Sequence, residues 1–131
     1  MHMKLELVPL PVADVDRAKA FYVDRLGFVA DVDVTPAPGV RFVQVTPPGS
    51  GCSISLTSGV PHLSETAPGT VRGLHLVVED VERARQELLD RGVEVSPVED
   101  VGGGVLYAWF RDPDGNSLTM QHMPWRTGEA Y

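Results

Sequence analysis

The chain has 131 residues, of which 43% are hydrophobic, and this composition suits a single globular domain with a buried core. The formal net charge of −7 argues against a nucleic-acid partner, because phosphate binding needs clustered Lys and Arg. The single cysteine excludes an intrachain disulfide. Neither a membrane-spanning apolar run nor a signal peptide is present, so we expect a cytoplasmic protein that does not contact a membrane.

The first half of the chain predicts a strand, a helix and three further strands. The first strand covers 5–12, and Asp14 then caps a helix by accepting from the free N–H groups of its first turn. Gly27 ends this helix, because glycine adopts a left-handed conformation cheaply. The helix carries an apolar stripe at i, i+3 and i+7, formed by Val15, Ala18 and Tyr22. Pro and Gly residues separate the three strands that follow, at 28–35, 40–46 and 52–57.

The second half of the chain repeats this order. Asp-Val-Asp-Arg-Ala-Lys at 14–19 returns 66 positions later as Asp-Val-Glu-Arg-Ala-Arg at 80–85. The pattern predicts a strand at 74–78, a helix from Asp80 to Gly92, and strands at 93–98, 105–111 and 117–123. Asp-Pro-Asp-Gly-Asn at 112–116 is typical of a tight turn between the last two strands. We therefore expect one domain over 4–123, made of module one (4–57), a linker (58–73) and module two (74–123), with a tail at 124–131.

Two stretches of the chain resemble the vicinal oxygen chelate superfamily, which contains glyoxalases, bleomycin-resistance proteins and extradiol dioxygenases. Residues 12–22, followed by Leu-Gly-Phe at 26–28, resemble its opening helix, and residues 110–116 resemble its late hairpin. The resemblance covers about 5–123. It implies an α+β fold in which two tandem βαβββ modules form an incomplete barrel around a cavity, with the helices outside. Because members of the superfamily often dimerise, we also expect a homodimer.

The resemblance also implies where a metal would bind. Enzymes of the superfamily hold a divalent metal with His, Glu or Gln at four equivalent positions, which fall here on Leu7, Ser55, Gly73 and Thr119. None of these supplies an imidazole or a carboxylate, the groups that suit such metals. We therefore expect no metal and no other cofactor, which argues against metal-dependent lyase, isomerase and dioxygenase chemistry. A displaced metal on His75 together with a linker residue, His62 or Glu65, stays open as an alternative.

Strand alternation separates the residues that face the helices from those that face the predicted cavity. The cavity side carries aromatic rings and neutral hydrogen-bonding groups, a mixture typical of small-molecule sites. The candidate ligand-binding residues are Leu7, Phe42, Gln44, Ser55, His75, Tyr107, Trp109, Thr119 and Gln121. Two alternatives remain open. Tyr107 and Trp109 would fill an ordinary core, or the alternating hydroxyls of 53–57 would simply face water.

Together these observations predict a metal-free protein that binds or sequesters a small aromatic or apolar, drug-like molecule. It would act as the bleomycin-resistance branch does in antibiotic resistance, without catalytic residues. The net charge would suit a cationic ligand. The first alternative is a glyoxalase-like lyase or isomerase, or a dioxygenase, that uses a displaced metal or His75 as general base. The second is an interaction module that acts through its dimer surface.

Overall fold

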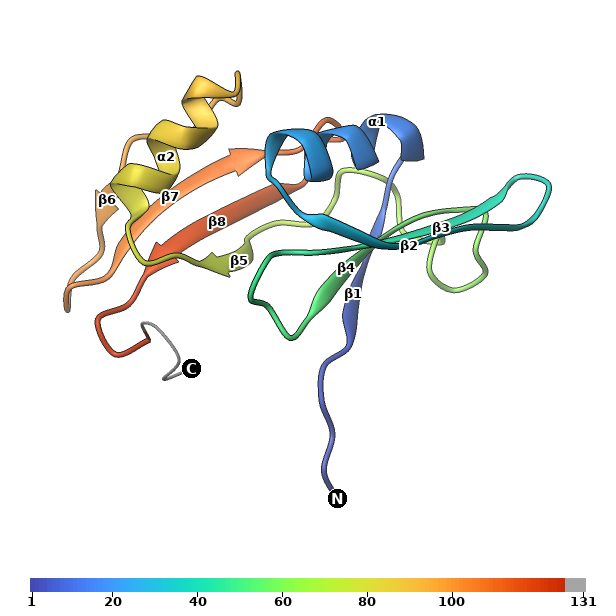
Figure 1. Cartoon of the computed structure of the whole chain (residues 1–131), viewed down its shortest axis with the longest axis horizontal. Helices are drawn as coiled ribbons and strands as arrows, with labels where there is room; N and C mark the ends of the chain where they lie inside the picture. The colour runs from blue at the N-terminus through green and yellow to red at the C-terminus, as the bar shows by residue number, and fades with distance from the viewer. Residues whose placement is uncertain (127–131) are drawn as a thin grey trace. The chain divides into compact units, whose positions relative to one another are not determined.

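The computed structural model describes residues 1–126 and divides the chain into two compact units (Figure 1). The first unit contains Met1–Thr70 and Pro113–Gly115, and the second contains Val71–Asp112 and the chain from Asn116 onward. The end of the predicted tail, 127–131, lies outside the described residues. Within 1–126, no helix is both long and apolar enough to cross a bilayer.

The first unit is a βαβββ module, as predicted. Its strands form one mixed sheet in the order β1-β4-β3-β2, in which β1 runs parallel to β4 and the other neighbours are antiparallel. The elements in chain order are β1 (Leu7–Pro11), α1 (Val15–Ala20), the π-helical turn η1 (Phe21–Arg25), β2 (Val29–Ala37), β3 (Val40–Thr46) and β4 (Ser53–Ser58).

The first helix begins and ends where the sequence predicts, but its second half is wider than an α-helix. The Asp14 side chain accepts from the backbone N–H of Arg17 at 3.1 Å, and Gly27 has a φ of 78°. In between, the backbone N–H of Leu26 donates to the carbonyl of Phe21, five residues earlier, at 3.1 Å, and the buried Tyr22 ring lies 5.7 Å from the Phe28 ring. This π-helical turn, which the sequence did not predict, places Tyr22 in the core.

The core of the first unit lies between α1 and one face of its sheet. Helix α1 packs against β3 and β4. Fully buried aliphatic side chains come from alternate positions of the strands: Leu10, Val43, Val45 and Leu56. Each contributes about 1.5–3 kcal/mol by leaving water. These residues alternate with those predicted to face the cavity, so the side of the sheet that packs against α1 is the side that the sequence predicts.

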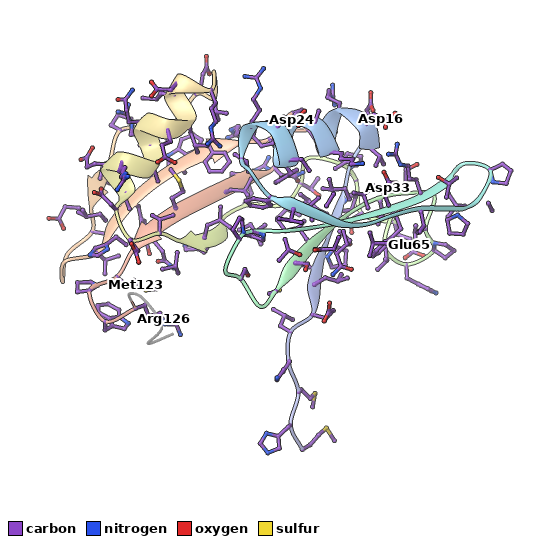
Figure 2. The ribbon with its side chains drawn as sticks, viewed as in Figure 1. Asp16, Asp24, Asp33, Glu65, Met123 and Arg126 are labelled. Carbon is purple, nitrogen blue, oxygen red and sulfur yellow. The ribbon has the colours of Figure 1, made fainter. Side chains whose placement is uncertain are left out.

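A group of charged side chains ties β2 and β3 to α1 on the surface of the first unit (Figure 2). Arg41 donates to the Asp33 carboxylate at 3.1 and 2.9 Å and also contacts Asp16. Lys19 of α1 donates to Asp33 at 2.9 Å. The hydrogen bonds from Arg41 and then from Lys19 hold the pKa of Asp33 well below its usual value. Asp33 is paired with Val43, so on the first sheet this charged cluster lies on the helix side, opposite the face of Phe42 and Gln44.

The second unit is also a βαβββ module, with its sheet in the order β5-β8-β7-β6 (Figure 1). Strands β5 and β8 are parallel, and the other neighbours are antiparallel. The α+β class and the two tandem modules are therefore confirmed. The elements are β5 (Leu74–Val77), α2 (Val81–Asp90), β6 (Glu99–Asp100), β7 (Leu106–Arg111) and β8 (Ser117–His122).

The strand predicted at 93–98 is wrong. Only an isolated bridge between Val95 and Phe110 forms there, and the short strand β6 follows it. The Ser96 backbone N–H donates to the carbonyl of Trp109 at 2.9 Å, but its hydroxyl accepts the Trp109 N–H, also at 2.9 Å, in place of a backbone carbonyl. Pro97 then interrupts the ladder because proline has no N–H to donate.

The core of the second unit repeats that of the first. Helix α2 packs against β7 and β8, with Val81 and Leu88 buried on its inner side. The strand residues under it, also buried, are Ala108, Phe110, Leu118 and Met120. All four belong to the set that strand alternation assigns to the helix side, so the opposite sheet face carries the candidate site residues.

The predicted turn at 112–116 is confirmed and is held by side chains. Buried Asn116 donates from its backbone N–H and from its side chain to the Asp112 carboxylate, at 2.9 Å each. The side-chain oxygen of Asn116 accepts from the backbone N–H of Val71 at 3.0 Å. Gly115, with a φ of 96°, completes the turn.

Candidate functional site

The nine candidate residues lie on the two sheets, on the face opposite the helix in each unit. Residues that are paired across neighbouring strands point to the same face, so the strand register decides which side chains meet. The first sheet carries Leu7 on β1, Phe42 and Gln44 on β3, and Ser55 on β4. The second sheet carries His75 on β5, Tyr107 and Trp109 on β7, and Thr119 and Gln121 on β8.

The candidate face of the first sheet centres on a row of three hydroxyls along β4. Ser53, Ser55 and Thr57 have exposed fractions of 7, 0 and 1%, so the alternative in which they face water is wrong. Ser53 shares a hydrogen bond with Thr46 at 2.6 Å, and Thr57 accepts from Ser64 at 3.0 Å. Ser55, between them, has no hydrogen-bond partner within residues 1–126. A buried hydroxyl without a partner is rare in folded proteins.

The half-buried residues around Ser55 supply one amide and apolar surface. Gln44 is paired with Ser55 across the strands, and its amide nitrogen donates to the Glu6 carboxylate at 3.2 Å. Phe42 is paired with Thr57 on the same face. Leu7 is paired with Ser53 at the start of β1. This face therefore combines an apolar rim with a hydroxyl that lacks a partner.

The candidate face of the second sheet carries aromatic rings beside neutral polar groups. Trp109 is paired with Thr119, and Tyr107 with Gln121. His75, next to Thr119 on β5, lies edge-to-face with Tyr107 at 5.8 Å. Trp109 is 42% exposed, so the alternative in which it fills the core is wrong. Within the described chain, the side chains of Thr119 and Gln121 make no hydrogen bond, which leaves them available to a ligand.

His75 presents one ring nitrogen to this face. Its Nδ1 contacts the carbonyl oxygen of Gly73. A carbonyl only accepts hydrogen bonds, so Nδ1 carries the hydrogen and Nε2 holds the lone pair. In neutral His75, Nε2 is therefore an acceptor for a ligand O–H or N–H.

Arg111 belongs to this site, although it was not among the predicted ligand-binding residues. It follows Trp109 by two positions on β7, and its guanidinium lies over the indole ring, 5.5 Å from the ring centre. This distance is typical of a cation–π contact. Strand alternation already places Arg111 on the same face as Trp109.

The positions of the family metal ligands do not fit a divalent metal here. Leu7 and Gly73 supply no ligand atom, and Ser55 and Thr119 supply only neutral hydroxyls. Gly73 has a φ of 71°, a conformation in which a histidine would be strained. Among residues 1–126, no three His, Cys, Asp or Glu side chains gather closely enough to hold a metal ion.

The family to which the chain belongs follows from comparison with known proteins. A family model described as Glyoxalase/Bleomycin resistance protein/Dioxygenase superfamily matches residues 4–120. The chain belongs to this superfamily. The resemblance that the opening helix and the late hairpin indicated is thereby confirmed, and so is the fold class that it implied.

Three relatives of this superfamily member show how far the similarity reaches. The uncharacterized protein YwkD of Bacillus subtilis (strain 168) is 30% identical over 106 residues, which are 78% of this chain and 83% of that protein. TnmS3, an antibiotic binding protein from Streptomyces sp. CB03234, has a TM-score of 0.80 and 34% identity, over 92% of this chain and 96% of its own. A superfamily member from Sphaerobacter thermophilus DSM 20745 has a TM-score of 0.80 and 33% identity, over 93% and 98% of the two chains.

Proposed function

We propose that this superfamily member binds a small aromatic molecule of antibiotic type without changing it, and so acts by sequestration. The observation that carries the proposal is the exposed Trp109 ring on the helix-free face of the second sheet, flanked by Tyr107 and by the polar groups of Thr119 and Gln121. Aromatic surface gives affinity for a planar molecule, and a few polar groups fix its orientation. TnmS3, which is 34% identical, is an antibiotic binding protein, and this supports the same class of function.

The proposed ligand-binding residues have two kinds of role. Trp109 and Tyr107 would contact the ligand rings, and His75, Thr119 and Gln121 would accept or donate hydrogen bonds at their edges. The first sheet is a separate candidate face, on which Leu7 and Phe42 would offer apolar contact and Gln44 an amide. The unpartnered hydroxyl of Ser55 would bond a polar ligand atom there.

A fluorescence titration tests the proposal. The chain has two tryptophans, Trp109 on the candidate face and Trp125 beyond β8, so each can be replaced separately. The protein is titrated with a panel of aromatic antibiotics, and binding is measured by intrinsic fluorescence and by calorimetry. We expect Trp109→Ala to weaken binding by about tenfold or more, since an aromatic contact contributes on the order of 1 kcal/mol beyond its buried area. The control variant Trp125→Ala should bind like the wild type.

Two results would reject sequestration at this face. One is a panel in which nothing binds, and the other is a ligand whose affinity is the same for Trp109→Ala as for the wild type. A bound ligand must also be recovered chemically unchanged after long incubation with the protein. The predicted homodimer and cytoplasmic location belong to the proposal as well, and sedimentation and cell fractionation test them.

A metal-free reaction is the second candidate function, because His75 lies on the same face as Thr119 and its Nδ1 contact leaves Nε2 with the lone pair. A histidine in this state takes a proton from a bound molecule as a general base. If an isomerase or lyase activity is found, His75→Gln should abolish turnover and leave ligand affinity within about twofold. Turnover that survives this change would exclude His75 as the base.

A further inference from the structure

We infer that the face of the first sheet opposite α1 binds an aromatic amine in its protonated form, and that Glu6 and Asp31 hold the ammonium group. The inference rests on the proposed function in taking this face as a ligand site, and it adds the chemical class of the ligand. It concerns the first unit alone and uses no residue of the second sheet. The formal net charge of −7 favours a cation in general, and the two carboxylates would hold it at one place.

Two carboxylates reach this face from outside the regular strand pairs. Glu6 precedes β1, and its carboxylate accepts from the Gln44 amide nitrogen at 3.2 Å. Asp31 lies at a register shift of β2 and is not paired with a residue of β3. A shift of this kind re-aims a side chain, and the Asp31 carboxylate accepts from the hydroxyl of Thr46. Gln44 and Thr46 are two positions, or about 7 Å, apart on β3, so both carboxylates contact the same face.

These two carboxylates have no positively charged partner in the described chain. Within residues 1–126, neither forms an ion pair with a Lys, Arg or His side chain. The side-chain hydrogen bonds that they accept come from an amide and a hydroxyl, both neutral. Lys19 and Arg41 instead bind Asp33 on the helix side of the same sheet. The candidate face therefore carries negative charge that a bound cation would compensate.

The buried hydroxyl of Ser55 is an independent indication that a ligand binds here. Ser55 is fully buried, and it makes no hydrogen bond within the described part of the chain. It is paired with Gln44, so its side chain points to the same face, next to the amide that donates to Glu6. Its oxygen has lone pairs for an N–H donor. A ligand N–H beside Glu6 would therefore also satisfy the Ser55 hydroxyl.

The unused hydrogen-bonding capacity of this face belongs mainly to acceptors. The carboxylates of Glu6 and Asp31 have more lone pairs than the hydrogen bonds that they accept among residues 1–126. The Gln44 amide donates its nitrogen to Glu6, which leaves its carbonyl oxygen as a further acceptor. Because acceptors do not bond one another, the ligand must supply donors. An ammonium supplies several N–H donors with the opposite charge, and Phe42 on the same face offers contact to an aromatic body.

Three probes that share one aromatic body test the inference. Naphthylethylamine carries the ammonium, naphthylethanol replaces it with a neutral hydroxyl, and the trimethylated amine keeps the charge without N–H donors. Calorimetry at neutral pH measures the binding of each probe to the full chain. We expect the amine to bind at least about tenfold more tightly than the alcohol, as a charge-assisted hydrogen bond implies. The trimethylated amine should bind with an intermediate affinity.

Removing the carboxylate charges should remove the preference for the amine. Glu6→Gln and Asp31→Asn keep the shape of each side chain and one acceptor oxygen. Because both groups are exposed, we expect each change to weaken amine binding about threefold and the double variant to lose most of the preference. Naphthylethanol should bind these variants within about twofold of the wild type. Ser55→Ala should weaken amine binding about tenfold, because the ammonium loses a buried acceptor.

The matched control is Asp24→Asn. Asp24 lies on η1, which continues α1 on the helix side of the first sheet, and forms no ion pair within residues 1–126 (Figure 2). The substitution changes the net charge by the same amount as Glu6→Gln or Asp31→Asn, and we expect amine affinity within about twofold of the wild type. Thermal unfolding of each variant establishes that it is folded. A shift of the Gln44 side-chain amide signal in NMR spectra establishes that the amine binds on the first sheet.

The outcomes separate this inference from the proposed function. Equal binding of the amine and the alcohol would reject the ammonium site, and so would an effect of Asp24→Asn as large as that of Asp31→Asn. Amine binding that Trp109→Ala abolishes and the double variant retains would place the amine on the second sheet, which also rejects it. If none of the probes binds the wild type, the inference fails, and the titration with aromatic antibiotics decides the proposed function separately.

Discussion

The three hydroxyl side chains of β4 are all buried, yet only two of them have a hydrogen-bond partner. Ser53 bonds Thr46 and Thr57 bonds Ser64, but Ser55 bonds nothing within residues 1–126. Burying a polar group without a partner costs about 1–3 kcal/mol. A bound water or a ligand atom that hydrogen-bonds Ser55 would remove this cost.

Replacing Ser55 should affect stability differently from replacing Ser53. We expect Ser55→Ala to unfold with the same free energy as the wild type, or with one up to about 1 kcal/mol higher, because the lost hydroxyl made no bond. Ser53→Ala, which removes a made hydrogen bond, should lower the unfolding free energy by about 1 kcal/mol. Urea unfolding measures both changes. Equal destabilisation by the two substitutions would mean that the Ser55 hydroxyl has a partner in solution, such as a bound water.

Each helix begins at an aspartate, and substitution of this residue tests how much its cap stabilises the helix. The Asp80 side chain accepts from the backbone N–H of Arg83 at 3.0 Å, as Asp14 does for α1. We expect Asp80→Ala to lower the unfolding free energy by about 1 kcal/mol, because a first-turn N–H loses its acceptor. Asp80→Asn keeps an acceptor and should cost only a few tenths of that amount. If both substitutions have the same effect in urea unfolding, the charge of Asp80 matters more than its hydrogen bond.

The elements that the sequence predicted well are those with local signals. Helix caps, positive-φ glycines and strand alternation act over a few residues, so both modules and the helix side of each sheet were predictable. The π-helical turn depends instead on where the Tyr22 ring packs. The absence of a strand at 93–98 depends on the Ser96 hydroxyl, which accepts the hydrogen bond from the Trp109 N–H that a backbone carbonyl would accept in a regular strand pair. Pairings of this kind are set by tertiary structure.

The candidate site was predictable to the same extent. Alternation assigned His75, Tyr107 and Trp109 to one face, and the strand register agrees. Alternation gives the direction of a side chain but neither its exposure nor its partners. The exposed Trp109 ring, the unpartnered Ser55 and the contact of Arg111 with the indole therefore had to come from the structure.

At the scale of the whole molecule, the charged cluster around Asp33 should make stability depend on pH. Hydrogen bonds from Arg41 and Lys19 lower the pKa of Asp33 in the folded state. The contribution of Asp33 is therefore complete above the unfolded-state pKa of about 3.9 and is lost as the pH falls below it towards the folded value. Asp33→Asn should cost no more than about 1 kcal/mol at pH 7, because these charges lie at the surface.

Urea unfolding of the wild type and Asp33→Asn at a series of pH values measures this dependence. The difference between the two proteins should shrink steadily below a pH of about 4. Asp24→Asn is the control, because Asp24 on η1 forms no ion pair within residues 1–126. A difference for Asp33→Asn that stays constant down to a pH of about 2.5 would show that its carboxylate is not stabilised by Arg41 and Lys19.

Strand β2 is the longest strand and lies at the edge of the first sheet, with nearly every residue exposed. Such an edge offers unpaired backbone groups on which other chains can build, which is the first step of aggregation. Its pairing with β3 shifts register between Ala30 and Val32 and again between Val34 and Ala37, where Pro36 contributes no N–H. Irregularities of this kind bend a strand away from the flat template that fibril growth needs. We therefore expect the same strand that carries Asp33 to hinder edge-to-edge aggregation at high concentration.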